Sequence, residues 1–262
     1  MTTSGLAKGW SNAEVYSRTF GRLCDGTVAV LLDGLTPTSG GLLDVGTGPG
    51  QLAREASERG WTVTAVDPSV EMLDIARTTA PSAICVEAAL PDLPCADGSF
   101  DAVVASYVVN HLDDPRGGVS EMTRVLRRGG VLAVTIWPAE LTAMNQMWTA
   151  VVERARVERP AAASPPAGSH FARTEAGLAR LLVEAGLAAE TSVATWDFVM
   201  DADLLWSGVE AGIAAIGTTY LAQGEDGRSA MTAAYREIVE ETSSDGVLRL
   251  PSRALVAHGT KV

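Results

Sequence analysis

The chain has 262 residues, of which 47% are hydrophobic, and its formal net charge is -12 at pH 7. This length allows one large α/β domain, or a domain with added segments, around a sizeable core. The acidic balance argues against nucleic acid and anionic membranes as partners, because both would repel the chain.

Three cysteines, Cys24, Cys85 and Cys95, are too few and too scattered for a disulfide framework or a metal cluster. The first ten residues lack the apolar core of a signal peptide, and no later run reaches the roughly 18 apolar residues that span a bilayer. We therefore predict a cytoplasmic protein without a metal or a membrane anchor, either a monomer or a homodimer.

The first half of the chain alternates strand and helix patterns. Apolar residues at roughly helical spacing predict two short helices between Asn12 and Leu35. A buried strand at 42–45 runs into a glycine turn and a helix that ends at Gly60; a strand at 62–66 then leads to a helix that Ser69 caps. Together these elements make a βαβ unit.

Three more strands are expected at 84–86, 100–106 and 131–137, with a helix that closes near Gly129 before the last of them. The alternation predicts a parallel sheet with helices on both faces. Such sheets bind ligands beyond the carboxyl ends of their strands, so residues that directly follow a strand are the first site candidates.

After Pro138 the pattern changes. A long amphipathic helix is predicted at 141–156, a mobile loop at 160–169 and a helix at 174–185. Strands follow at 191–200 and 247–257, with helices at 203–221 and 228–241 between them. The acidic run at Glu237, Glu240 and Glu241 is interpreted as a solvated helix face, because no histidine lies at metal-ligand spacing.

The glycine turn reads Leu-Leu-Asp-Val-Gly-Thr-Gly-Pro-Gly over residues 42–50. Glycines let the backbone bend and approach a ligand at the start of a helix. A dinucleotide fingerprint would place its third glycine at position 51, where the chain has Gln51, so a phosphate-free ligand is favoured. Asp67 ends the second strand, where a carboxylate can accept hydrogen bonds from a ribose diol; alternatively, it only caps the next helix.

Two further sequence motifs are more specific than the glycine turn alone: Asp-Gly-Ser-Phe-Asp-Ala-Val-Val at 97–104 and Arg-Val-Leu-Arg-Arg-Gly-Gly-Val-Leu at 124–132. With the glycine turn and Asp67, they make the chain resemble the class I S-adenosylmethionine-dependent methyltransferases, in particular the small-molecule branch related to ubiquinone and menaquinone methyltransferases. The likeness extends over the segments 42–50, 63–72, 93–114 and 121–137.

The resemblance implies that Asp44 and the backbone of the glycine turn hold the amino acid end of S-adenosylmethionine, and that Asp67 binds both ribose hydroxyls. Met72 would pack on adenine, although it is equally suited to a core position. The family's usual adenine-binding acid is replaced by Ala89, which leaves that contact to backbone groups or to Asp92. The predicted cofactor-binding residues are Tyr16, Asp44, Gly46, Thr47, Gly48, Asp67, Pro68, Met72, Ala89, Leu90 and Ser106.

His111 follows the fourth strand and is the best candidate for a general base, since an imidazole titrates near neutral pH. The alternative is that it only braces its loop; His170 and His258 are weaker candidates. The remaining flanks are expected to bind an apolar or aromatic acceptor, unless their aromatic residues belong to the core. The predicted acceptor-binding residues are Phe20, Tyr107, His111, Trp137, Met144, Trp148, His170 and Trp206, and Tyr220 could join them.

The resulting fold prediction is a doubly wound α/β protein with a mostly parallel, seven-stranded, Rossmann-like sheet, N-terminal helices and an inserted helical cap. Residues 1–36 would cover the cofactor, 37–137 form the core, 138–186 supply the cap and mobile loop, and 187–262 complete the sheet and the acceptor pocket. The expected activity is methyl transfer from S-adenosylmethionine to a small molecule. Alternatives are a nicotinamide-dependent oxidoreductase, or a relative that binds the cofactor without catalysis.

Overall fold

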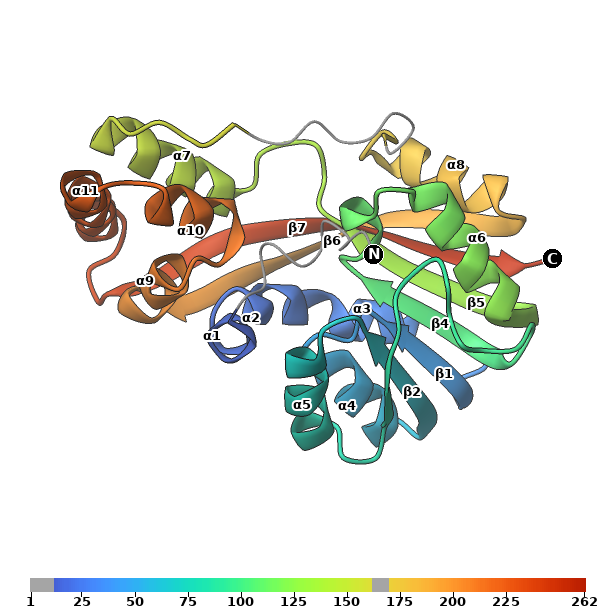
Figure 1. Cartoon of the computed structure of the whole chain (residues 1–262). Helices are drawn as coiled ribbons and strands as arrows, with labels where there is room; N and C mark the ends of the chain where they lie inside the picture. Colours follow the sequence, from blue (N-terminus) through green and yellow to red (C-terminus); the bar gives the residue numbers. More distant parts are fainter. Residues whose placement is uncertain (1–11, 162–169) are drawn as a thin grey trace.

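A computed structural model describes residues 12–161 and 170–262, and a seven-stranded sheet forms its centre (Figure 1). The strands lie in the order β3-β2-β1-β4-β5-β7-β6; β1 to β5 pair in parallel, and β7 runs antiparallel to both of its neighbours. The predicted mostly parallel, Rossmann-like sheet is therefore confirmed. Its strands are β1 (Gly40–Val45), β2 (Trp61–Asp67), β3 (Ile84–Glu87), β4 (Phe100–Ser106), β5 (Leu126–Ile136), β6 (Leu187–Asp201) and β7 (Val247–Lys261).

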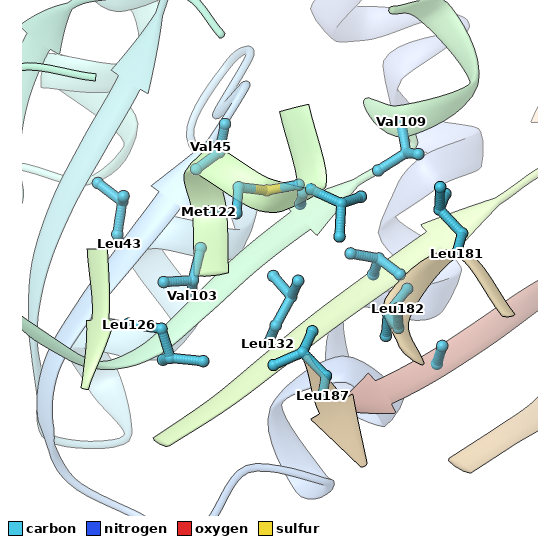
Figure 2. Close-up of a cluster of buried hydrophobic side chains, with 14 of the residues drawn as sticks. Leu43, Val45, Val103, Val109, Met122, Leu126, Leu132, Leu181, Leu182 and Leu187 are labelled. Atoms are coloured by element: carbon cyan, nitrogen blue, oxygen red, sulfur yellow. The ribbon is translucent and has the colours of Figure 1, made fainter. Parts of the chain in front are cut away.

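Neighbouring side chains of the central strands enter two different cores. Leu43 of β1 joins Val103 and Leu132 beneath α6 (Pro115–Val125) and α8 (Glu175–Glu184), in the cluster that Figure 2 shows. Leu42 belongs to the opposite cluster, with residues of α3 (Val28–Asp33) and α4 (Gln51–Glu58). Because successive strand residues face opposite sides, a strand buried on both faces reads as one apolar run, as the sequence did.

The β6–β7 hairpin extends well beyond the central sheet. Its two strands pair along fifteen residues each, whereas β5 pairs with β7 only from Leu255 onward. The far half of the hairpin carries a helical lobe, which consists of α7 (Ala143–Ala155), α9 (Ala202–Glu210), α10 (Ala214–Leu221) and α11 (Glu225–Thr242) (left in Figure 1). A third apolar cluster fills the space between these helices and the hairpin.

The segment predicted as one inserted cap divides between two places. Helix α7 contacts α11 in the helical lobe, whereas α8 packs against β6 and contributes to the core of the sheet. A cap role for this segment and the domain boundaries given above therefore stay predictions. Most of the predicted mobile loop at 160–169 lies outside the described residues.

Three helical predictions need correction. The helix expected to close near Gly129 ends at Val125, because β5 begins at Leu126. The N-terminal region forms three helices and a 3-10 turn instead of two helices: α1 (Ala13–Arg18), α2 (Gly21–Cys24), η2 (Asp25–Thr27) and α3. The helix predicted at 203–221 is divided into α9 and α10, because Gly212 between them adopts a left-handed backbone with φ of +82°. Helix α5 (Val70–Thr79) has the predicted Ser69 cap.

No helix within the two described ranges is long and apolar enough to cross a membrane. Within the same ranges, no group of three or more His, Cys, Asp or Glu side chains could hold a metal ion. Glu237 and Glu241 instead pair with Arg154 of α7, at 3.6 and 2.9 Å.

Candidate active site

A cavity of about 570 Å³ lies where β1, β2 and β4 end, at the carboxyl edge of the parallel strands. Its volume is within the range of ordinary small-molecule sites. Parallel sheets favour ligands at this edge, because the turns that follow adjacent strands meet there. All the predicted cofactor-binding residues line the cavity: Tyr16, Asp44, Gly46, Thr47, Gly48, Asp67, Pro68, Met72, Ala89, Leu90 and Ser106.

The three glycines of the turn adopt left-handed backbones but serve different purposes. A Cβ at Gly50 would lie 2.9 Å from the Cα of Ala76 in α5, so this glycine allows two helices to approach closely. A Cβ at Gly48 would meet nothing within 4 Å, because this residue faces the open cavity. The Gly46 and Thr47 N–H groups both donate to the Val66 carbonyl, at 2.8 and 3.0 Å, which ties the turn to β2.

Asp44 is buried below the turn, with 1% of its surface exposed. Its carboxylate accepts a hydrogen bond of 2.7 Å from the Thr47 hydroxyl. Burial raises the Asp44 pKa to about 7, and the nearby charge of Asp67 acts in the same direction, while the Thr47 hydrogen bond opposes them. The cavity therefore has an acid that titrates near neutral pH at one end.

Asp67 uses both carboxylate oxygens to organise the same end of the cavity. One oxygen accepts from the Gly48 N–H and the other from the Ser69 N–H, both at 2.9 Å. Burial raises the Asp67 pKa, and these two N–H donors oppose the rise. The capping alternative for Asp67 is wrong, because the Ser69 side chain caps α5 by accepting from the Met72 N–H. Each Asp67 oxygen keeps a lone pair for a further donor.

Two aromatic residues line the cavity where β4 and β5 end. Tyr107 follows β4 and stacks on Trp137, which follows β5, with ring centroids 4.1 Å apart and planes 22° apart. His111 also lines the cavity, in the 3-10 turn η3 (Val109–His111). Burial of the imidazole ring lowers the His111 pKa, and the positive charge of Arg173 lowers it further. The imidazole is consequently neutral at pH 7.

The structure places the other predicted acceptor-binding residues away from this lining. Phe20, Met144, Trp148 and Trp206 are buried in the cluster of the helical lobe, which Tyr220 borders. Trp148 and Trp206 both stack on Tyr235, Trp206 with ring centroids 4.6 Å apart, and the Phe20 ring packs at a tilt against Trp148. The core alternative thus describes their positions. His170 is exposed, and His258 in β7 is 3.0 Å from the Leu31 carbonyl, a contact between strand and helix.

The two sequence phrases brace the opposite edge of the sheet. Asp97 pairs with Arg124, and Asp101 pairs with Arg127 while accepting from the Gly41 N–H at 2.8 Å. The close approach of these segments also explains Gly130, where a Cβ would lie 2.7 Å from the Asp101 carbonyl. The segments 97–104 and 124–132 therefore indicate the fold and do not directly indicate the ligand.

Several cavity residues are absent from the predicted set. Gln51 is the first residue of α4, and its position directly after the glycine turn is a signal that would have found it. Cys24 and Asp25 come from the N-terminal helices and offer no motif. Burial raises the Asp25 pKa to about 6, although Arg22 pulls it down. Asp92 is exposed outside the lining, which leaves backbone groups of Ala89 and Leu90 there.

Comparisons with known proteins agree with this arrangement. A family model described as a methyltransferase domain matches residues 43–134. The malonyl-[acyl-carrier protein] O-methyltransferase of Enterobacter lignolyticus is 37% identical over 119 residues, which are 45% of this chain and 47% of that protein. An uncharacterized methyltransferase of Mycobacterium tuberculosis is 40% identical over 96 residues, 37% of this chain and 39% of that protein. The chain thus spans less than half the length of these two relatives.

Solved structures are similar over most of the chain. The YcgJ protein from Bacillus subtilis has a TM-score of 0.56 at 18% identity, over 90% of this chain and 98% of that one. Phosphoethanolamine N-methyltransferase 2 of Haemonchus contortus, solved with S-adenosyl-L-methionine, has a TM-score of 0.51 at 17% identity, over 90% of this chain and 52% of that one. These likenesses establish the fold. Over residues 43–134, the chain is similar to the methyltransferase domain family.

Proposed function

We propose that the protein binds S-adenosylmethionine in the 570 Å³ cavity and transfers its methyl group to a small acceptor with an apolar or aromatic body. The observation that carries the proposal is that one cavity is lined by the acids Asp44 and Asp67 of β1 and β2 and by the aromatic residues Tyr107 and Trp137 after β4 and β5. Asp44 and Asp67 suit a cofactor with a cationic sulfur and an ammonium group, and the stacked pair Tyr107 and Trp137 suits an apolar acceptor.

The surroundings of these two acids fit the cofactor in two further ways. The open space above Gly48 admits a ligand against the backbone, and N–H groups at the start of α4 lie next to the turn, where a carboxylate is favoured. In this proposal Asp44 and the turn hold the amino acid end, while Asp67 accepts from the ribose hydroxyls. Met72, Ala89 and Leu90 would enclose the adenine; Tyr16 and Ser106 would contact the methionine part.

When bound, S-adenosylmethionine supplies a methyl group whose bond to the positive sulfur breaks as the bond to the acceptor forms, so that a neutral thioether leaves. The protein's main task is then to align the acceptor and to exclude water. A hydroxyl or ammonium acceptor must also lose a proton, which neutral His111 can accept.

The relatives' names favour oxygen as the methylated atom, since one of them is an O-methyltransferase. The matched residues 43–134 include most of the cavity lining, among them Tyr107 and His111, and the helical lobe lies outside them. The acceptor is therefore argued from Tyr107, Trp137 and His111. The branch within the family stays a prediction.

Titration calorimetry with S-adenosylhomocysteine tests the cofactor assignment. We expect Asp67→Ala to weaken binding roughly 10–100-fold, because a charged acceptor of hydrogen bonds is lost. Asp74→Ala is a matched control: Asp74 is an exposed acid of α5 that pairs with Arg77. Equal affinities for the two variants would contradict the Asp67 assignment.

A thermal-shift panel with NAD, NADP and S-adenosylhomocysteine separates methyl transfer from nicotinamide chemistry. Stabilisation by a nicotinamide cofactor alone would refute the proposal. Methyl transfer to an acceptor, measured as turnover, distinguishes an enzyme from a relative that binds the cofactor without catalysis.

For His111, we compare the kinetics of His111→Ala with those of the wild type across pH, on an acceptor that is methylated. A loss below about threefold in kcat/KM assigns His111 a structural role.

A further inference from the structure

Gln51 occupies the position where a dinucleotide fingerprint has its third glycine. It is the first residue of α4, directly after Gly50, and it lines the cavity. A glycine there leaves room for a pyrophosphate against the helix, whereas a glutamine brings an amide group to the same place. This amide is neutral and can donate two hydrogen bonds through its NH2 group.

Arg54 fixes the orientation of the Gln51 amide. Its guanidinium donates a hydrogen bond of 3.2 Å to the Gln51 side-chain oxygen. Because a guanidinium has only donors, the oxygen and not the NH2 group must face it. Arg54 lies outside the cavity lining and pairs with Glu58, one turn further along α4, at 3.4 Å. The amide oxygen is thus occupied, and the NH2 group is left to donate to another partner.

The charges around the cavity decide which groups could bind a carboxylate. Among the lining residues that the structure describes, none is lysine or arginine, whereas four are acidic: Asp25, Asp44, Asp67 and Glu71. A zwitterionic amino acid end brings a carboxylate into the cavity together with its ammonium group. Without a cationic side chain, neutral hydrogen-bond donors must hold this carboxylate.

Asp44 and Gln51 meet at the first turn of α4. The N–H of Ala53, in this turn, hydrogen-bonds to the Asp44 carboxylate. In the proposed function Asp44 holds the ammonium group of the cofactor. The ammonium and carboxylate groups of an α-amino acid are attached to one carbon atom, so their partners must lie close together. Gln51 meets this condition as the first residue of the same turn, where the helix dipole also favours an anion.

We infer that the Gln51 NH2 group donates a hydrogen bond to the carboxylate of the cofactor's amino acid end. Gln51 then makes the cavity selective for adenosyl ligands that carry an amino acid chain on sulfur. The inference rests on the proposed function, because it needs the cofactor in this cavity.

Two ligands that differ only in the amino acid chain test the inference. Titration calorimetry measures the affinities of S-adenosylhomocysteine and of 5′-methylthioadenosine, in which a methyl group replaces that chain. We expect Gln51→Ala to weaken S-adenosylhomocysteine about tenfold and to change 5′-methylthioadenosine less than about twofold. Gln146→Ala, which changes an exposed glutamine of α7 outside the cavity lining, should leave both affinities unchanged.

Gln51→Glu separates a binding role from a structural one. At the first position of α4 a carboxylate suits the helix dipole, so the melting temperature should not fall. The same carboxylate repels that of the cofactor, and S-adenosylhomocysteine should weaken about thirtyfold while 5′-methylthioadenosine is unaffected.

Unchanged S-adenosylhomocysteine affinity in Gln51→Ala and Gln51→Glu overturns the inference. An equal loss for both ligands also overturns it, because Gln51 would then act through the fold of α4. A wild type that binds the two ligands equally well has the same consequence. Failure of the wild type to bind either ligand contradicts the proposed function itself.

Discussion

Cofactor binding should depend on pH through Asp44. This carboxyl group is buried in the cavity lining, and its pKa of about 7 leaves it mostly protonated in slightly acidic solution. In the proposed function, the ammonium group of the cofactor lies beside Asp44 and favours the ionised form of this carboxyl group. Binding must then release a proton below pH 7, so the affinity for S-adenosylhomocysteine should fall as the pH is lowered.

The size of the effect follows from the Asp44 pKa. With a value of about 7, roughly one tenth of the free protein has an ionised Asp44 at pH 6, and roughly nine tenths at pH 8. If only the ionised form binds, the dissociation constant is about tenfold higher at pH 6 than at pH 8, which is about 1.4 kcal/mol. Binding should release about 0.9 proton at pH 6 and about 0.1 at pH 8.

Calorimetry in buffers with different ionisation enthalpies measures both the affinity and the number of protons released. Asp44→Asn removes the titrating group and should bind more weakly, with little remaining dependence on pH between 6 and 8. This variant separates Asp44 from Asp25, whose pKa of about 6 adds a smaller change at the acidic limit. A tenfold pH effect that persists in Asp44→Asn would refute the reasoning.

Three further predictions separate the cavity from the scaffold. Gly48→Ala and Gly60→Ala each place an alanine at a positive φ, +53° and +94°, without a clash, but only Gly48 faces the cavity. Calorimetry should show lower S-adenosylhomocysteine affinity for Gly48→Ala alone. Asp101→Ala loses the Gly41 N–H and Arg127 partners, so denaturant unfolding should show a loss of about 1–3 kcal/mol with unchanged cofactor affinity. Trp206→Phe shrinks a packed side chain whose indole N–H has no partner among the described residues. It should cost about 1–3 kcal/mol in the same assay and leave affinity within twofold; a larger loss of affinity would place Trp206 in the binding site.

The sequence predicted the sheet, and it predicted residues that line the cavity around the glycine turn, because both depend on local signals. A strand buried on both faces needs a short apolar run, and a turn that approaches a ligand needs glycine, as Gly48 shows. Asp67 was identifiable for the same reason, since it directly follows such a strand. The order of these local signals along the chain then defines the edge where they meet.

The aromatic lining of the cavity could not be predicted equally well, because the same apolar and aromatic residue types occur in buried cores and in pockets. Trp148 and Trp206 have the apolar spacing of pocket residues, yet the long β6–β7 hairpin gives the helices around them a core to fill. Nothing local predicts that hairpin's length. Tyr107 shows the opposite case: its left-handed backbone depends on Thr135, a residue on the neighbouring strand, and no property of tyrosine suggests it.

The residues proposed to bind the methyl donor and those proposed to bind the acceptor therefore lie in different parts of the sequence. In the proposed function, the acids assigned to the cofactor lie in β1 and β2, which hydrogen bonds connect by linking Asp67 to Gly48 and Val66 to Gly46. The residues proposed for the acceptor lie at the ends of β4 and β5, where Tyr107 stacks on Trp137 and its N–H donates to Thr135. A change of acceptor therefore needs substitutions at these strand ends, while the bonded unit that holds the cofactor can stay intact.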